Sequence, residues 1–239
     1  WGLSRVSSRM TPNYEHSTYQ YVDSQDGSGV EVYVLDTGIN VEHTDFGGRA
    51  EHGFTAPGIT EGDDDLNGHG THCAGSVGGT KYGVAKGVKL IAVKVLGFFG
   101  FGSNTDIISG IEYVHQQHTA GSKTVMNLSL GGAGSSPAME AALQAAIDAG
   151  VHAVVAAGNS NADACSFSPA HLADAITVAA SNIKDDMYSS SNHGTCVDVI
   201  APGENIPSTY IGGPDATATL TGTSMAAPHV AGWVARHLS

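Results

Sequence analysis

Short apolar runs recur along the chain and alternate with segments of helical periodicity. The clearest runs lie at 30–35, 90–96, 124–130, 151–157, 175–180 and 196–200. Several are apolar on both faces, which is typical of buried parallel strands; half-exposed antiparallel strands alternate apolar and polar side chains instead. The pattern therefore predicts a largely parallel sheet.

Two of the intervening segments carry helix signals. Ser103 stands three residues before Asp106, which resembles a capping box, and an apolar stripe follows. Ser136 precedes Pro137, as an N-cap precedes a proline at the first helical position, and Gly150 ends that segment. Strands that alternate with helices predict an α/β fold with helices on both faces of the sheet. Functional residues are then expected beyond the carboxyl ends of the strands.

Composition narrows the class of protein without changing this picture. The 239 residues include 32 glycines, 41% hydrophobic and 14% charged residues, and no repeat or linker divides them, so residues 1–239 are expected to form a single domain. The formal net charge of -13 argues against nucleic acid and anionic membranes as partners. No apolar run reaches the length of a membrane span.

Three segments carry residues with the chemistry of acyl transfer. Asp36 follows the first apolar run, His69 lies in Asn-Gly-His-Gly-Thr-His, and Ser224 lies in Gly-Thr-Ser-Met-Ala. Taken singly, they suit a turn aspartate, a loop or metal-binding histidine and a helix N-cap serine. Together they supply a nucleophile, a base and a carboxylate that orients the base, in the chain order of subtilisin.

These segments closely resemble the three active-site signatures of the subtilisin (subtilase) family. Residues 1–5 (WGLSR), 83–87 (GVAKG) and 127–132 (NLSLGG) look like proteinase K-type enzymes of that family, so the resemblance covers essentially the whole chain. It implies a subtilisin-like three-layer fold. It also implies a serine endopeptidase that hydrolyses proteins through an acyl-enzyme, with Asp36, His69 and Ser224 as its triad.

The resemblance assigns further residues of the site. Asn159 would donate to the oxyanion beside the backbone N–H of Ser224. Two extended segments would pair with a substrate peptide, the first formed by Gly100, Phe101 and Gly102 and the second by Ser129, Leu130 and Gly131. The S1 pocket would be lined by three small residues, Ala156, Ala157 and Gly158. Backbone pairing implies broad specificity, and small uncharged walls imply preference for a hydrophobic or aromatic P1 residue.

Three aromatic residues lie close together beside the first of these segments. Phe98, Phe99 and Phe101 are expected to form an apolar rim on the S4 side of the groove, with burial in the core as the alternative.

The cysteine count is odd, so at least one thiol is free or pairs between chains. Resemblance to the aqualysin-like branch implies a disulfide between Cys165 and Cys196. Cys73, which follows His69-Gly70-Thr71-His72, looks more like the proteinase K branch and is expected to be free beneath His69. Three free thiols remain the alternative.

A structural calcium ion is also implied by the resemblance, bound by the carbonyls of Ala173 and Ala175 and the carboxylate of Asp198. Oxygen ligands of this kind suit Ca²⁺. The acidic run 63–65 could hold a second ion, although a solvated acidic loop is favoured.

The remaining expectations concern cell biology and the ends of the chain. The resemblance implies a secreted monomer that acts on protein or peptide substrates and is inhibited by its own propeptide before maturation. By the same resemblance, the sequence is expected to lack the propeptide and the usual C-terminal end of the domain. Alternatives are a binding protein that keeps the fold without turnover, a lipase or esterase, which the absence of Gly-x-Ser-x-Gly disfavours, and a Ser-Glu-Asp acid peptidase, which His69 disfavours.

Overall fold

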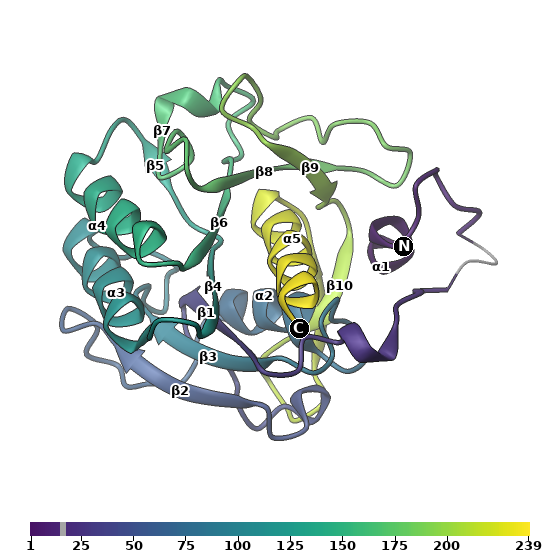
Figure 1. Cartoon of the computed structure of the whole chain (residues 1–239), viewed down its shortest axis with the longest axis horizontal. Helices are drawn as coiled ribbons and strands as arrows, with labels where there is room; N and C mark the ends of the chain where they lie inside the picture. The colour runs from purple at the N-terminus through teal and green to yellow at the C-terminus, as the bar shows by residue number, and fades with distance from the viewer. Residues whose placement is uncertain (15–17) are drawn as a thin grey trace.

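A seven-stranded sheet forms the centre of the computed structural model, which describes residues 1–14 and 18–239 (Figure 1). Every neighbouring pair of strands is parallel, which confirms the predicted α/β class. In spatial order the strands are β2 (Ala50–Thr55), β3 (Lys89–Lys94), β1 (Val30–Asp36), β4 (Lys123–Leu128), β6 (His152–Ala156), β8 (Ile176–Ser181) and β9 (Val199–Pro202).

Helices cover both faces of this sheet (Figure 1). On one face lie α3 (Asn104–Gln117) and α4 (Pro137–Asp148), and on the other α2 (His69–Gly78) and α5 (Thr223–Leu238). Successive strand residues serve opposite cores: Val34 belongs to the core that contains α2 and α5, and Leu35 to the core that contains α3 and α4. Both faces are therefore buried, which is why these strands are apolar throughout.

Short elements complete the fold. They are α1 (Gly2–Val6), β5 (Gly132–Ala133), β7 (Phe167–Ser168), β10 (Ile206–Thr209), β11 (Thr217–Leu220) and the 3-10 turns η1 (Asp23–Gln25), η2 (Thr44–Phe46) and η3 (Ala164–Ser166). No helix among the described residues is long and apolar enough to cross a membrane. The disulfide expected between Cys165 and Cys196 is present, and Cys73 is a buried free thiol.

The structure differs from the sequence-based expectations in several elements besides the short ones. Helix α2 and strand β2 were not predicted, because small residues dominate α2 and β2 is a partly exposed edge strand. Strand β9 begins at Val199 instead of Cys196, because a turn that closes from Val197 N to the Gly194 carbonyl delays it. Pro137 opens α4 as expected, but the side chain of Ser136 makes no capping bond. The expected cap of α3 is confirmed, since Ser103 Oγ accepts from Asp106 N.

Two buried histidines lie in the helices beneath the site. His72 in α2 donates from Nε2 to the Ile206 carbonyl, and His229 in α5 donates from Nδ1 to the Met225 carbonyl. Burial lowers the pKa of each ring to about 4, so both are neutral in the folded protein at neutral pH.

Acidification should therefore destabilise the fold. An unfolded histidine has a pKa of about 6.5. As the pH falls from about 6.5 to about 4, these two histidines are therefore protonated in the unfolded chain but stay neutral in the native state. The stabilisation is complete above that window, and roughly 3 kcal/mol per histidine is lost across it.

Urea unfolding of the Ser224→Ala variant, which lacks the expected nucleophile, measures this loss between about pH 7 and about pH 4. Adding His229→Gln should flatten the pH dependence, whereas adding His193→Gln, at an exposed ring, should leave it steep. Equal slopes in these two variants would contradict the assignment.

Candidate active site

The predicted catalytic residues come from four elements whose ends meet at one edge of the sheet. Asp36 ends β1, His69 begins α2, Asn159 follows β6 and Ser224 lies in the first turn of α5. Cys73 lies between two of them, with Sγ 3.9 Å from His69 Nδ1 and 3.3 Å from the Ser224 carbonyl oxygen. Burial raises the pKa of the Cys73 thiol, so it stays neutral at neutral pH.

Asp36 and His69 form a close pair. Nδ1 of His69 lies 2.7 Å and 2.9 Å from the two carboxylate oxygens of Asp36, which is fully buried. Burial lowers the pKa of the imidazole, but the Asp36 carboxylate outweighs that effect and holds the pKa well above its usual value. Because Nδ1 donates to Asp36, Nε2 is the nitrogen left to accept a proton, and the side chain is 27% exposed.

Asp65 ties the segments that carry these two residues together. Its buried carboxylate accepts five hydrogen bonds of 2.6 to 3.0 Å, from Thr37 Oγ1, Asn67 N, Gly68 N, Thr71 N and Thr71 Oγ1. The expectation of a solvated acidic loop is therefore wrong for Asp65. It holds for its exposed neighbours at 63 and 64.

The buried ammonium of Lys94 and a close contact between the start of α2 and the end of β1 also hold these segments together. Lys94 donates from Nζ to the carbonyls of Thr37 at 2.7 Å and Asp64 at 3.0 Å, and its charge is paired with Glu61 at 3.4 Å. Gly70 N donates to Thr37 Oγ1, and a Cβ at Gly70 would lie 2.2 Å from the Gly38 carbonyl oxygen. The start of α2 can approach the end of β1 this closely only without a side chain.

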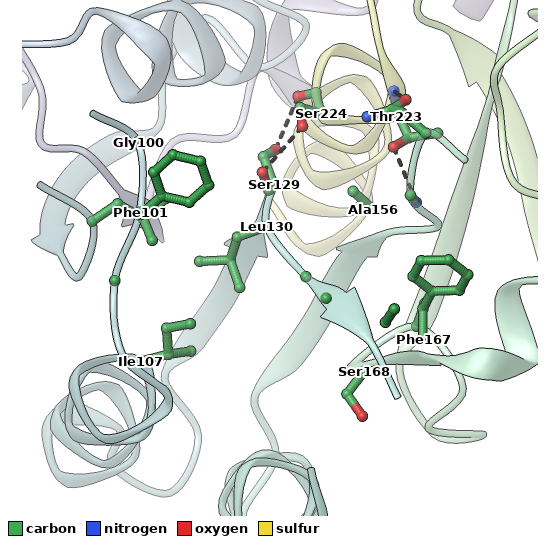
Figure 2. Close-up of a pocket in the computed structure, with 18 of the residues that line it drawn as sticks. Gly100, Phe101, Ile107, Ser129, Leu130, Ala156, Phe167, Ser168, Thr223 and Ser224 are labelled. Atoms are coloured by element: carbon green, nitrogen blue, oxygen red, sulfur yellow. Dashed lines mark hydrogen bonds between the residues drawn. The ribbon is translucent and has the colours of Figure 1, made fainter. Parts of the chain in front are cut away.

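The hydroxyl of Ser224 is held by the neighbouring strand end. Ser224 Oγ donates to the Ser129 carbonyl at 3.1 Å, while Ser129 Oγ donates to the Ser224 carbonyl at 2.9 Å (Figure 2). No hydrogen bond joins Ser224 Oγ to His69 in the part of the chain that the structure describes. Ser224 N–H lies in the first turn of α5, where amides lack helical partners and the helix dipole is positive.

Asn159 is fixed by the same helix. Its Oδ1 accepts from Thr223 N at 2.9 Å, and Gly158 N donates to Thr223 Oγ1 at 3.2 Å. The bond from Thr223 N to Asn159 Oδ1 orients the side-chain amide of Asn159. Because Oδ1 already has this partner, Nδ2 is available as a donor in the cleft. The geometry suits an oxyanion donor.

A cleft of about 810 Å³ runs past His69, Asn159 and Ser224. All nine residues expected to bind substrate line it: Gly100, Phe101, Gly102, Ser129, Leu130, Gly131, Ala156, Ala157 and Gly158. In Figure 2, Phe101, Ile107 and Leu130 lie on one side of the cleft, and Ala156, Phe167 and Ser168 on the other.

The aromatic rim is exposed. The exposed fractions of Phe98, Phe99 and Phe101 are 49%, 81% and 82%, so the alternative of a buried core is wrong. Phe99 and Phe101 line the cleft, and the Phe98 ring packs edge-on against Phe99 at 5.0 Å.

Sequence reasoning missed several residues of the cleft. Ile107 comes from α3, Met139 from α4, and Phe167 and Ser168 from β7. None lies in a signature segment. The available signal was the apolar stripe of the two helices, which predicts burial and does not reveal that the stripe reaches the cleft.

The expected calcium ligands lie together at the start of β8. Asp198 Oδ2 accepts from Thr177 N at 2.8 Å, and Asp198 N donates to the Thr177 carbonyl at 3.0 Å. Ala175 immediately precedes β8, and Asp198 is bonded to the second residue of that strand, Thr177. Carboxylate and carbonyl oxygens fit Ca²⁺.

Comparison with known proteins establishes the family. The family model described as the subtilase family (Peptidase_S8) matches residues 27–239, so this chain belongs to the subtilase family. This finding confirms the resemblance noted in the sequence.

Relatives match over the whole chain. It is 54% identical to "Subtilisin-like protease 3" of Saccharomyces cerevisiae and 52% identical to "Subtilisin-like serine protease Rho m 2.0101" of Rhodotorula mucilaginosa, each over 100% of this chain. This chain spans about half (51%) of the length of the Saccharomyces cerevisiae protein and 71% of the length of the Rhodotorula mucilaginosa protein. The crystal structure of a cold adapted subtilisin-like serine proteinase superposes with a TM-score of 0.91 at 45% identity, covering 100% of this chain and 84% of that one.

Removing the amide of Asn159 should lower kcat with little change in KM. In a subtilisin, loss of a single oxyanion donor costs about 10²–10³ in kcat, and we expect the same order for Asn159→Ala. Asn159→Asp, which replaces the donor by an anion of equal shape, should lose at least as much. Ester hydrolysis, normalised to titrated active sites, measures both, and an unchanged kcat in Asn159→Ala would refute the role.

Proposed function

We propose that this protein is a secreted serine endopeptidase that hydrolyses peptide bonds in proteins through an acyl-enzyme. We further propose broad specificity with preference for a hydrophobic or aromatic P1 residue. The observation that carries the proposal is the Asp36–His69 pair at one cleft with Ser224 and Asn159. Membership of the subtilase family supports it.

In this mechanism, Ser224 Oγ attacks the scissile carbonyl carbon while His69 Nε2 takes the hydroxyl proton. The negative charge that forms on the carbonyl oxygen is met by Asn159 Nδ2 and Ser224 N–H. His69 then gives its proton to the leaving amine as the C–N bond breaks, and the acyl group stays on Ser224. A water molecule then attacks the acyl-enzyme carbonyl carbon while His69 Nε2 takes its proton. His69 returns that proton to Ser224 Oγ as the acyl group leaves as a carboxylic acid, and Asp36 stabilises the imidazolium in both steps.

The Ser129 carbonyl links substrate binding to the nucleophile. It accepts the Ser224 hydroxyl, yet it belongs to the segment proposed to pair with substrate backbone. A substrate N–H that donates to this carbonyl competes with Ser224 for it. The hydroxyl is then released toward His69, which aligns the nucleophile as the substrate arrives.

The cleft lining supports the proposed P1 preference. Among the described residues that line it, none is Asp, Glu, Lys or Arg. Its apolar members include Ile107, Leu130, Met139, Ala156 and Phe167. A basic P1 side chain would lose its hydration without gaining an ion pair, whereas an aromatic side chain gains roughly 1.5–3 kcal/mol from burial.

A fluorophosphonate and a set of peptide substrates test the proposal together. The probe should label Ser224 in the wild type and not in Ser224→Ala, and the wild type should hydrolyse casein. Because His69 must be neutral to act as base and its pKa is raised, kcat/KM should rise toward alkaline pH.

With otherwise identical peptides, we expect kcat/KM at P1 Phe to exceed that at P1 Lys by at least about tenfold. Labelling with esterase but no protease activity would favour a lipase or esterase. A protein that takes no label would be a binding protein with the same fold.

The disulfide supports the proposal of secretion, since such bonds persist in oxidising compartments. Fractionation of producing cells should find the protein in the medium. We also propose a monomer that its own propeptide inhibits before maturation. Size-exclusion chromatography and inhibition by added propeptide measure these two points.

We propose one structural calcium ion bound by the carbonyls of Ala173 and Ala175 and the carboxylate of Asp198. Oδ2 of Asp198 is oriented by Thr177 N, which leaves Oδ1 for the cation.

Chelation should therefore lower the Tm of the Ser224→Ala protein by about 5–10 °C, the shift expected when a ligand well above its Kd is removed. Asp198→Asn should abolish the response to calcium. Asp174→Asn, at an exposed carboxylate nearby that bonds to Gln144, should preserve it. A Tm insensitive to both chelator and calcium would rule the site out.

A further inference from the structure

One wall of the cleft is built from two very short strands. β5 and β7 pair antiparallel through Gly132 with Ser168 and Ala133 with Phe167. Pairing over two residues on each strand contributes little stability by itself. Both strands line the cleft that Ser224 also lines, so other contacts must hold this wall at a fixed distance from the opposite side of the cleft.

A partly buried carboxylate that does not line the cleft supplies that support. Glu140, in the first turn of α4, accepts from Ser136 N at 3.1 Å and from the hydroxyl of Ser168 with the same oxygen, Oε1. Ser136 N also donates to Ser168 Oγ at 2.8 Å. Ser168 lines the cleft and is 4% exposed, so these bonds join α4, the segment that follows β5, and β7 behind the cleft.

The second oxygen of Glu140 is held from the segment after β7. His171 Nε2 lies 3.2 Å from Glu140 Oε2, and His171 Nδ1 lies 3.1 Å from the Phe167 carbonyl. Each carboxylate oxygen of Glu140 therefore has a partner, and His171 links the segment after β7 to α4. Burial raises the pKa of Glu140, but the bonds from Ser168 and Ser136 outweigh it and lower the pKa below its usual value.

We propose that Glu140 is a specificity-determining positioning residue, which fixes the β5–β7 wall at the depth needed to receive a large apolar P1 side chain. The inference deepens the proposed endopeptidase function and rests on it. Phe167 of this wall lies against Gly158 of the proposed S1 pocket, since a Cβ at Gly158 would lie 3.7 Å from Phe167 Cδ1. A large P1 side chain would therefore reach the β5–β7 wall, whereas a P1 alanine would be too short to reach it. Loss of the support should therefore penalise substrates according to P1 size.

Direct recognition of a basic P1 side chain is the competing role for a carboxylate at this place. The geometry disfavours it, because both oxygens of Glu140 already have partners and the carboxylate does not line the cleft. Its side chain is 15% exposed. Glu140 thus acts on the substrate through Ser168 and Phe167.

The test compares Glu140→Gln with the wild type on three peptides that differ only at P1, with Phe, Ala or Lys. We expect kcat/KM to fall about tenfold for P1 Phe, mostly through KM, and to stay within about twofold for P1 Ala, because a charge-assisted support of the far wall is lost. The matched control is Asp148→Asn, which removes an exposed carboxylate from the other end of α4 and should change none of the three.

Two outcomes would overturn the proposal. An equal loss for P1 Phe and P1 Ala would mean that Glu140 supports the fold or the catalytic centre generally. A loss confined to P1 Lys would make it a recognition carboxylate. If Glu140→Gln does not fold, Ser168→Ala removes one support and leaves Ser136 N bonded to Glu140, and it should show the same dependence on P1 size in smaller measure.

Titration of active sites with a fluorophosphonate tests the role of Glu140 separately from the proposed endopeptidase function. A wild type that takes no label would defeat the endopeptidase proposal itself. A wild type and a variant that both take the label and both hydrolyse the P1 Ala peptide uphold that proposal, whatever the P1 Phe result says about Glu140.

Discussion

The carboxylate of Asp65 is the interaction on which the geometry of the site depends. The two residues that must meet, Asp36 and His69, lie 33 positions apart, at the end of a strand and the start of a helix. Asp65 accepts from the residue after the first and from the helix start that carries the second. Five donors converge on one buried anion, so losing it would leave several buried N–H and O–H groups without partners at once.

Small residues are the second constraint, because the elements that carry the site must pack unusually close. Helix α5 packs on the sheet through Ala226, Ala227, Ala231 and Ala235, which are all fully buried. Alanine lets the helix axis approach the strands, and the start of the helix then reaches the ends of β4 and β6. The bonds that Thr223 donates to Asn159 and accepts from Gly158, and the bond that Ser224 donates to Ser129, depend on that close approach.

Sequence reasoning predicted what depends on local pattern. The buried strands were visible because both faces of each are apolar, and the triad and Asn159 were visible through signature segments. It missed α2, whose many small residues give no clear amphipathic period. It also misjudged Asp65, whose burial depends on Thr37, just after β1, and on the start of α2. Glu140 and Ser168 were invisible for the same reason: they lie 28 positions apart and acquire a role only where the fold brings α4 and β7 together.

The hydrogen bonds that hold the loop after β6 also affect the chemical stability of Asn159. An asparagine ages when the backbone nitrogen of the next residue attacks its side-chain carbonyl carbon and expels ammonia. Here the attacking nitrogen, that of Ser160, donates to the buried Asn192 at 2.9 Å, while the Asn159 carbonyl is turned to Thr223 N. Both reacting groups are engaged elsewhere, so the arrangement that aims the amide at the cleft also protects it from conversion to an acid.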